Sequence, residues 1–72
     1  MEFMDLTGMR CPIPVLKARK MMKSLEVGAR LKVHATDPGA ERDFPAFCSS
    51  HGHKLRSVNW DGDILVVEME KG

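Results

Sequence analysis

The sequence predicts an α/β (α+β) fold, a two-layer α/β sandwich in which two helices cover one face of a four-stranded mixed sheet. Three observations lead to this prediction. The chain has 72 residues, enough for one hydrophobic core, so we expect a single domain over residues 1–72. Along the chain, the spacing of apolar residues is typical of a strand, a helix, a strand, a helix and two further strands, in the order βαβαββ. The last two strand segments are joined by Asp61-Gly62, a strong hairpin signal, which adds antiparallel pairing to the sheet.

The first half of the chain reads as strand, helix and strand. Phe3–Leu6 is a short apolar strand that ends at Thr7-Gly8. Arg30–Thr36 alternates apolar and polar residues, which is typical of a half-buried strand. Between them, Pro12–Leu25 has helical periodicity, and Gly28 follows as a stop signal. On a helical wheel its apolar positions gather within an arc of roughly 120°; they are Pro14, Val15, Ala18, Met21, Met22 and Leu25.

A second helix is expected after the turn Asp37-Pro38-Gly39, where Asp37 can cap a helical turn. Pro45 is unfavourable inside a helix because it lacks an amide donor. We therefore expect a short turn over 38–42 and a helix proper that is capped by Asp43 and ends at Gly52. Its apolar face, at helical spacing, consists of Ala40, Phe44, Phe47 and Cys48.

The hairpin strands are Leu55–Trp60 and Ile64–Glu70. We expect Trp60 and Val66-Val67 to contribute to the core of the sheet. Both helices then fall on one face of the sheet, because four short strands and two helices are most economically arranged in two layers.

Composition excludes several classes of protein. The chain is 43% hydrophobic and 29% charged, the balance of a soluble globular domain. A net charge of +1 argues against a generic nucleic-acid binder. Its apolar runs are far shorter than the ~20 residues that span a bilayer, and Met1-Glu2 does not open a secretion signal. Two cysteines, Cys11 and Cys48, do not make a disulfide framework, so we expect a reduced, cytoplasmic protein.

The charges are unevenly distributed along the chain. Residues 10–32 carry seven basic side chains and one acidic one, whereas residues 61–71 carry four acidic side chains and one basic one. Two solvated faces of opposite sign would account for this bias. The functional alternative is a basic docking surface on one side of the domain.

Cys11 is the residue on which the chemistry of this sequence depends. It precedes Pro12-Ile13-Pro14, and prolines are tolerated in the opening turn of a helix because the first amides have no partner there. The prolines fix the turn, so Cys11 is held at a helix N-terminus, where the dipole favours negative charge. Arg10 and Lys17 add positive charge nearby. We therefore expect a lowered pKa and a reactive thiolate.

Other interpretations of Cys11 must be weighed against this one. A buried apolar role is common for free cysteines, although turns at helix N-termini are seldom fully buried. A dithiol redox role would need the second cysteine of a Cys-x-x-Cys motif. Acyl-transfer chemistry would need a positioned base, and nothing in the sequence places His34, His51 or His53 beside Cys11. A thiolate that only accepts and passes on a sulfur atom needs nucleophilicity, exposure and a docking surface, with no cofactor.

The segment around Cys11 resembles the signature of a known family. Residues 5–14, DLTGMRCPIP, match the pattern D-x-x-G-x-x-C-P-x-P of the TusA/SirA-like sulfur carrier family. Ile13 is a departure, because some members carry an acidic residue there, and it bears on the identity of the partners. The later segments agree in register, so the resemblance covers nearly the whole chain; they are Asp37-Pro38, Arg42-Asp43-Phe44-Pro45, Phe47-Cys48 and Gly52-His53-Lys54-Leu55.

The resemblance implies a βαβαββ fold and a sulfurtransferase that acts as a carrier rather than a stand-alone catalyst, with a persulfide on Cys11. It implies a cysteine desulfurase or another sulfurtransferase as donor and a downstream protein as acceptor. In the family such a relay can feed tRNA wobble-uridine thiolation, molybdenum cofactor assembly or sulfur-compound oxidation. We expect Arg10, Pro12 and Pro14 to support the nucleophile. Partners are expected to contact the exposed positions of the first helix, namely Ile13, Leu16, Lys17, Arg19, Lys20 and Lys23.

Three alternatives concern other residues. Cys48 lies on an apolar stripe and is expected in the core, with a second-thiol role as the lesser alternative. A metal site built from Cys11, Cys48, His51 and His53 has a spacing that matches no common zinc pattern, so we expect no metal. A small RNA- or DNA-binding module could use the basic face of the first helix, but it would lack paired aromatics on a strand for base stacking. We expect neither direct nucleic-acid binding nor membrane attachment.

Overall fold

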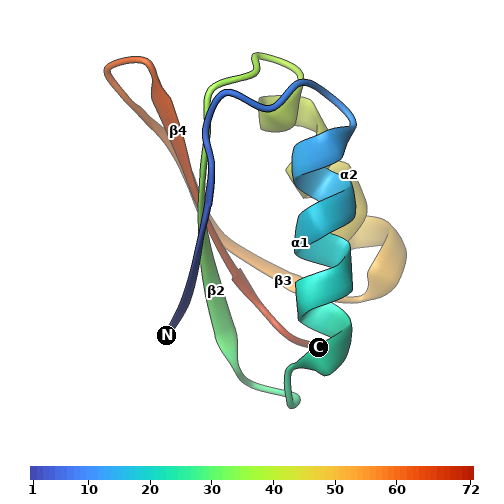
Figure 1. The fold of residues 1–72 in the computed structure, drawn as a ribbon. Helices are drawn as coiled ribbons and strands as arrows, with labels where there is room; N and C mark the ends of the chain where they lie inside the picture. The colour runs from blue at the N-terminus through green and yellow to red at the C-terminus, as the bar shows by residue number, and fades with distance from the viewer.

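Two helices pack against one face of a four-stranded sheet (Figure 1), as the sequence predicted. The computed structural model describes all 72 residues. None of its helices is long and apolar enough to cross a membrane. The elements follow the expected order, and outside the second helix each boundary lies within one residue of the predicted one. They are β1 (Glu2–Leu6), α1 (Ile13–Ser24), β2 (Arg30–Ala35), α2 (Ala40–His51), β3 (Lys54–Asp61) and β4 (Ile64–Glu70).

The sheet has the strand order β1-β2-β4-β3 and is mixed, as expected. β1 and β2 are parallel, whereas β4 pairs antiparallel with both β2 and β3. Because β1 and β2 are parallel neighbours, the turns that follow them emerge at the same end of the sheet (Figure 1). The Gly8 amide joins these turns by donating to Thr36 Oγ1 at 2.8 Å. The parallel pairing of β1 and β2 therefore brings the turn that contains Cys11 close to the start of α2.

The core lies between the sheet and the two helices. Alternate residues of the central strands face the helices and are fully buried, including Leu31, Val33, Leu65 and Val67. Burying a side chain of this size stabilises the fold by ~1.5–3 kcal/mol. The predicted apolar arc of α1 is confirmed, because all six of its members are buried or half-buried: Pro14, Val15, Ala18, Met21, Met22 and Leu25.

α2 begins earlier than the sequence predicted. The amides of residues 40–43 already bond to the carbonyls of residues 37–39, so the expected turn and helix form one element with Pro45 inside it. The prediction that Asp43 caps this helix is wrong, because the N-cap position is Gly39. Pro45 removes only the hydrogen bond to the Glu41 carbonyl. The buried stripe of Ala40, Phe44, Phe47 and Cys48 runs past the proline on both sides and outweighs that loss.

The predicted hairpin joins β3 and β4, with Asp61 paired to Ile64 and Gly62 in the left-handed region at φ 60°. The prediction that Trp60 lies in the core is wrong. Trp60 pairs with Leu65 on the helix-facing side, but β3 is an edge strand, and the indole is 42% exposed. Its N–H donates to the carboxylate of Glu41 on α2.

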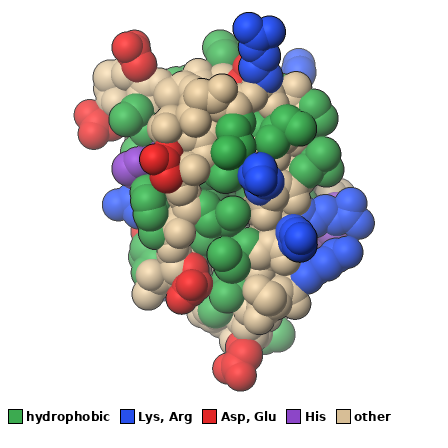
Figure 2. All heavy atoms as spheres, viewed as in Figure 1, with side chains coloured by type: hydrophobic (Ala, Val, Ile, Leu, Met, Phe, Trp, Pro, Cys, Tyr) green, Lys and Arg blue, Asp and Glu red, His purple; other side chains and the backbone are tan.

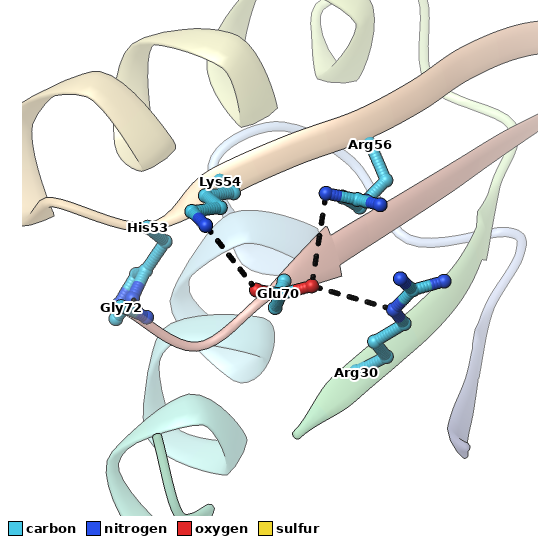
Figure 3. A network of polar contacts seen from close by, with 6 residues as sticks. All are labelled: Arg30, His53, Lys54, Arg56, Glu70 and Gly72. Atoms are coloured by element: carbon cyan, nitrogen blue, oxygen red, sulfur yellow. Dashed lines mark hydrogen bonds and ion pairs between the residues drawn. The ribbon is translucent and has the colours of Figure 1, made fainter. Parts of the chain in front are cut away.

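The open face of the sheet carries a separate group of charges. Figure 3 shows that the Glu70 carboxylate on β4 is approached by three cations, at 3.4 Å from Arg30, 3.7 Å from Lys54 and 3.8 Å from Arg56. Arg30 belongs to the basic stretch that the sequence singled out, yet it lies on this face and not on α1. The basic stretch is therefore divided between a paired sheet face and the exposed face of α1.

Candidate functional site around Cys11

Cys11 lies in the turn between β1 and α1, two residues before the helix begins, and its side chain is exposed. The turn is closed by backbone bonds, in which the Ile13 amide donates to the Arg10 carbonyl at 2.8 Å and the Leu16 amide to the Pro12 carbonyl at 3.2 Å. Pro14 is buried at the second position of α1. Pro12 occupies the N-cap position, and the Cys11–Pro12 peptide bond is cis. The predicted placement of the cysteine at a helix N-terminus is confirmed.

An acidic side chain from α2 contacts the thiol. The Cys11 Sγ–H donates to Oδ2 of Asp43 at 2.6 Å, across 32 residues of sequence. Sequence reasoning missed this contact because it assigned Asp43 to a helix cap. The available signal was its position within a segment that resembles the same family as the Cys11 motif.

Gly39 allows α2 to approach Cys11 closely. A Cβ atom at this position would lie 3.2 Å from Cys11 Cβ, 3.4 Å from Cys11 Sγ and 2.9 Å from Oδ2 of Asp37. The Asp37 oxygen is fixed because it accepts the Gly39 amide at 2.9 Å. Cys11 is therefore placed against the beginnings of two helices, α1 by chain connection and α2 by packing.

The pKa of Cys11 is raised above that of an ordinary thiol, so the expectation of a lowered value is wrong. Its main cause is the hydrogen bond to the Asp43 carboxylate, followed by partial loss of hydration and repulsion from Asp43 and Asp37. The cation that lowers the pKa is Arg42. The negative neighbours brought by α2 thus outweigh the positive ones that the local sequence suggested.

Cys11 and Asp43 lie at the edge of an open groove of about 430 Å³ between α1 and α2. Most of its exposed lining is apolar, and it includes Leu16 and Arg19 from the predicted docking residues. A second hollow of about 270 Å³ shares these two side chains and adds Lys20 and Lys23. The groove beside the thiol is therefore continuous with part of the basic face of α1.

The remaining predicted docking residues do not line the groove with Cys11. Ile13 is 42% and Leu16 51% exposed, so both apolar side chains are open to solvent on α1. Lys17 lines a third hollow beside Met4 of β1, and neither Ile13 nor Arg10 lines the groove. Figure 2 shows Lys and Arg side chains gathered over α1, with hydrophobic side chains between them.

The second cysteine and the histidines occupy different settings. Cys48 is 2% exposed, which confirms its predicted core position, and burial raises the pKa of its thiol. His51 lines the groove that contains Cys11, a placement that no sequence pattern had predicted. Its Nδ1 lies 3.2 Å from the Phe47 carbonyl oxygen. His53 packs against the Phe47 ring and its Nδ1 accepts the Gly72 amide at 3.1 Å.

The comparisons with known proteins agree with the resemblance found in the sequence. The family described as Sulfurtransferase TusA matches residues 2–71, and the chain belongs to this family. The chain is 46% identical over 68 residues to the sulfur carrier protein TusA of Pseudomonas putida, which covers 94% of this chain and 85% of the relative. The YrkI protein of Bacillus subtilis is 44% identical over 71 residues, covering 99% and 95% of the two chains.

The fold is likewise shared with a solved structure. The crystal structure of a SirA-like protein from Desulfitobacterium hafniense superposes with a TM-score of 0.87. The alignment covers 100% of this chain and 99% of the other, at 25% sequence identity. The predicted mixed four-stranded sheet with two helices on one face is therefore confirmed by a fold known from experiment.

Proposed function

We propose that the protein is a sulfur carrier that takes up a sulfane sulfur as a persulfide on Cys11 and delivers it to a downstream protein. The observation that carries this proposal is the placement of Cys11, the exposed thiol of the two free cysteines, at the start of α1. Relatives that are named sulfur carrier protein TusA support the same role. The donor is a cysteine desulfurase or another sulfurtransferase. The acceptor belongs to tRNA thiolation, molybdenum cofactor assembly or sulfur-compound oxidation.

The chemistry is a thiol–persulfide exchange. Cys11 loses its proton, and Sγ attacks the terminal sulfur of a donor persulfide, R–S–SH. A new S–S bond forms at Sγ, while the donor's S–S bond breaks and its electron pair stays on the donor sulfur, which then takes up a proton. In delivery, an acceptor thiolate attacks the terminal sulfur in the same way and releases Cys11. No net oxidation occurs, so the exchange needs no cofactor.

Residues near Cys11 support this role through the backbone and through packing. The Arg10 carbonyl accepts the Ile13 amide, Pro12 occupies the N-cap, and buried Pro14 fixes the first turn of α1. Residues 1–72 act as one domain in the cytoplasm, where reducing conditions keep both cysteines free.

Partner proteins dock on the exposed face of α1. Ile13 and Leu16 offer apolar contact near the thiol, and Leu16 belongs to the groove beside Cys11. The cations attract an acidic patch on the partner and speed its association; they are Lys17, Arg19, Lys20 and Lys23.

The proposal is tested by loading the protein with a cysteine desulfurase and free cysteine. We expect the intact mass to rise by ~32 Da, one sulfur atom on one thiolate, and the adduct to be removed by a reductant. The adduct should be absent in Cys11→Ser and present in Cys48→Ala, which leaves no buried hydroxyl unpaired. An adduct that persists in Cys11→Ser, or that never forms on the wild-type protein, would refute the proposal.

A further inference from the structure

We propose that Asp43 is a positioning residue that holds Cys11 in its protonated thiol form while no partner is bound. The inference deepens the proposed function and rests on Cys11 being the residue that reacts. It follows from the contact between the Cys11 thiol and the Asp43 carboxylate on α2.

The geometry of the pair requires a proton between the two atoms. Cys11 Sγ and Asp43 Oδ2 are 2.6 Å apart, and without a proton both would carry negative charge at this separation. Carboxyl groups ordinarily ionise roughly 4 to 5 pH units below thiols, so the shared proton resides on sulfur. The raised pKa of Cys11 agrees with this arrangement.

Asp43 is held in place by the packing of α2. Its amide donates to the Gly39 carbonyl at 3.0 Å, and the next residue, Phe44, is fully buried. Gly39 itself leaves room for the Cys11 side chain against the same turn. The backbone of Asp43 is therefore fixed by the first turn of the helix, and its carboxylate extends from there to the thiol.

Charges of both signs face the thiol. Asp43 and Asp37 disfavour its ionisation, and Arg42 favours it. Groove and chain neighbours add further titratable or cationic groups, which are Arg10 before the cysteine, Arg19 on α1 and His51 on α2. Asp43 is the one that bonds Sγ directly, and the direct hydrogen bond is the largest influence on the pKa.

As a consequence, the Cys11 thiol of the free carrier reacts slowly with small electrophiles. Only the thiolate is nucleophilic, so a thiol whose proton is held by Asp43 reacts slowly in the free protein. Asp43 also lines, together with Cys11, the groove beside Sγ that a partner can enter. A partner that places a cation against Asp43 would remove the repulsion at the moment of transfer.

Alkylation with iodoacetamide across a pH range tests this inference without any sulfur donor. We expect the rate–pH profile of Asp43→Asn to be shifted to lower pH than that of the wild-type protein, because Asn keeps the shape of the side chain and removes its charge. For each unit by which the pKa falls, the rate at pH 7 should rise roughly threefold, since a tenfold gain in thiolate is partly offset by weaker nucleophilicity. The matched control is Glu41→Gln, which removes one negative charge from the same turn of α2, and its profile should match the wild type.

Cys48 provides an internal check on folding in the same experiment. Because it is 2% exposed, a folded variant should take up one adduct and an unfolded one two. If Asp43→Asn takes up two, Asp43→Ser replaces it and is expected to shift in the same direction. Coincident profiles of the wild type and a folded Asp43 variant would overturn the inference. Failure of the persulfide proposal would instead appear as a missing sulfur adduct on a normally alkylated protein.

Discussion

Gly39→Ala should destabilise the protein even though its backbone conformation suits alanine. Gly39 has φ −64° and ψ −23°, ordinary helical values. At such a position alanine normally stabilises a protein by ~0.4–1 kcal/mol, because it restricts the unfolded chain. Here the new Cβ would lie 2.9 Å from Oδ2 of Asp37 and 3.2 Å from Cys11 Cβ, so the neighbours must move.

The magnitude follows from what Asp37 loses when it moves. Its Oδ2 accepts the Gly39 amide at 2.9 Å, and a hydrogen bond to a charged group contributes ~1.5–3 kcal/mol. Subtracting the alanine gain leaves a net loss of about 0.5–2.6 kcal/mol. For a domain of this size the melting temperature should fall by about 2–20 °C.

A double-mutant cycle with Asp37→Ala isolates the cause. Urea unfolding of the two single variants and the double variant gives their free energies of unfolding. In the Asp37→Ala background the 2.9 Å approach to the carboxylate is absent and only the milder approach to Cys11 at 3.2 Å remains, so Gly39→Ala should cost less than it does in the wild-type protein. If Gly39→Ala is as stable as the wild type, or costs the same with and without Asp37, the steric reasoning is wrong.

Two further predictions concern charge. The double variant Lys20→Glu/Lys23→Glu should slow sulfur transfer to and from partner proteins and weaken the dependence of the transfer rate on ionic strength, while alkylation of Cys11 stays unchanged. Equal transfer rates would show that the basic face is only a solvated surface. Salt-sensitive binding of bare RNA that is lost in the same variant would favour the nucleic-acid alternative. Burial, Lys71 and His51 lower the pKa of His53, so the folded protein binds this proton less tightly than the unfolded chain. The free energy of unfolding should therefore decrease as the pH falls from 7 to 5, and urea titrations of His53→Gln should show a smaller decrease; identical slopes would contradict the assignment.

The fold was largely predictable because its signals are local. Alternation in β2 and helical spacing in α1 each fall within a few residues, and the Asp61-Gly62 turn is a local hairpin signal. The predictions failed where residues distant in the sequence determine the extent of an element or the burial of a side chain. Pro45 lies within α2 because the buried stripe around Phe44 outweighs one lost hydrogen bond, and Trp60 is exposed because β3 is an edge strand. Neither fact can be read from neighbouring residues.

The same distinction explains the wrong sign for the pKa of Cys11. Sequence reasoning weighed the residues nearest in the chain, Arg10 and Lys17, together with the dipole of α1. The structure places Asp43 against the thiol because parallel pairing of β1 and β2 brings the following turns to one end of the sheet. Contacts across 32 residues carry no local pattern, so only the family resemblance of the Asp43 segment pointed to it.

This arrangement couples the chemistry of Cys11 to the packing of α2. Phe44 is fully buried and follows Asp43 directly in the first turns of α2. A core substitution that shifts this part of the helix would therefore also move Asp43 relative to Cys11, because packing strain is transmitted along a close-packed helix. Under the two proposals made above, the proton on the thiol is controlled from α2, whereas partners dock on the solvent side of α1. Variants of the two helices should accordingly separate thiol reactivity from partner recognition.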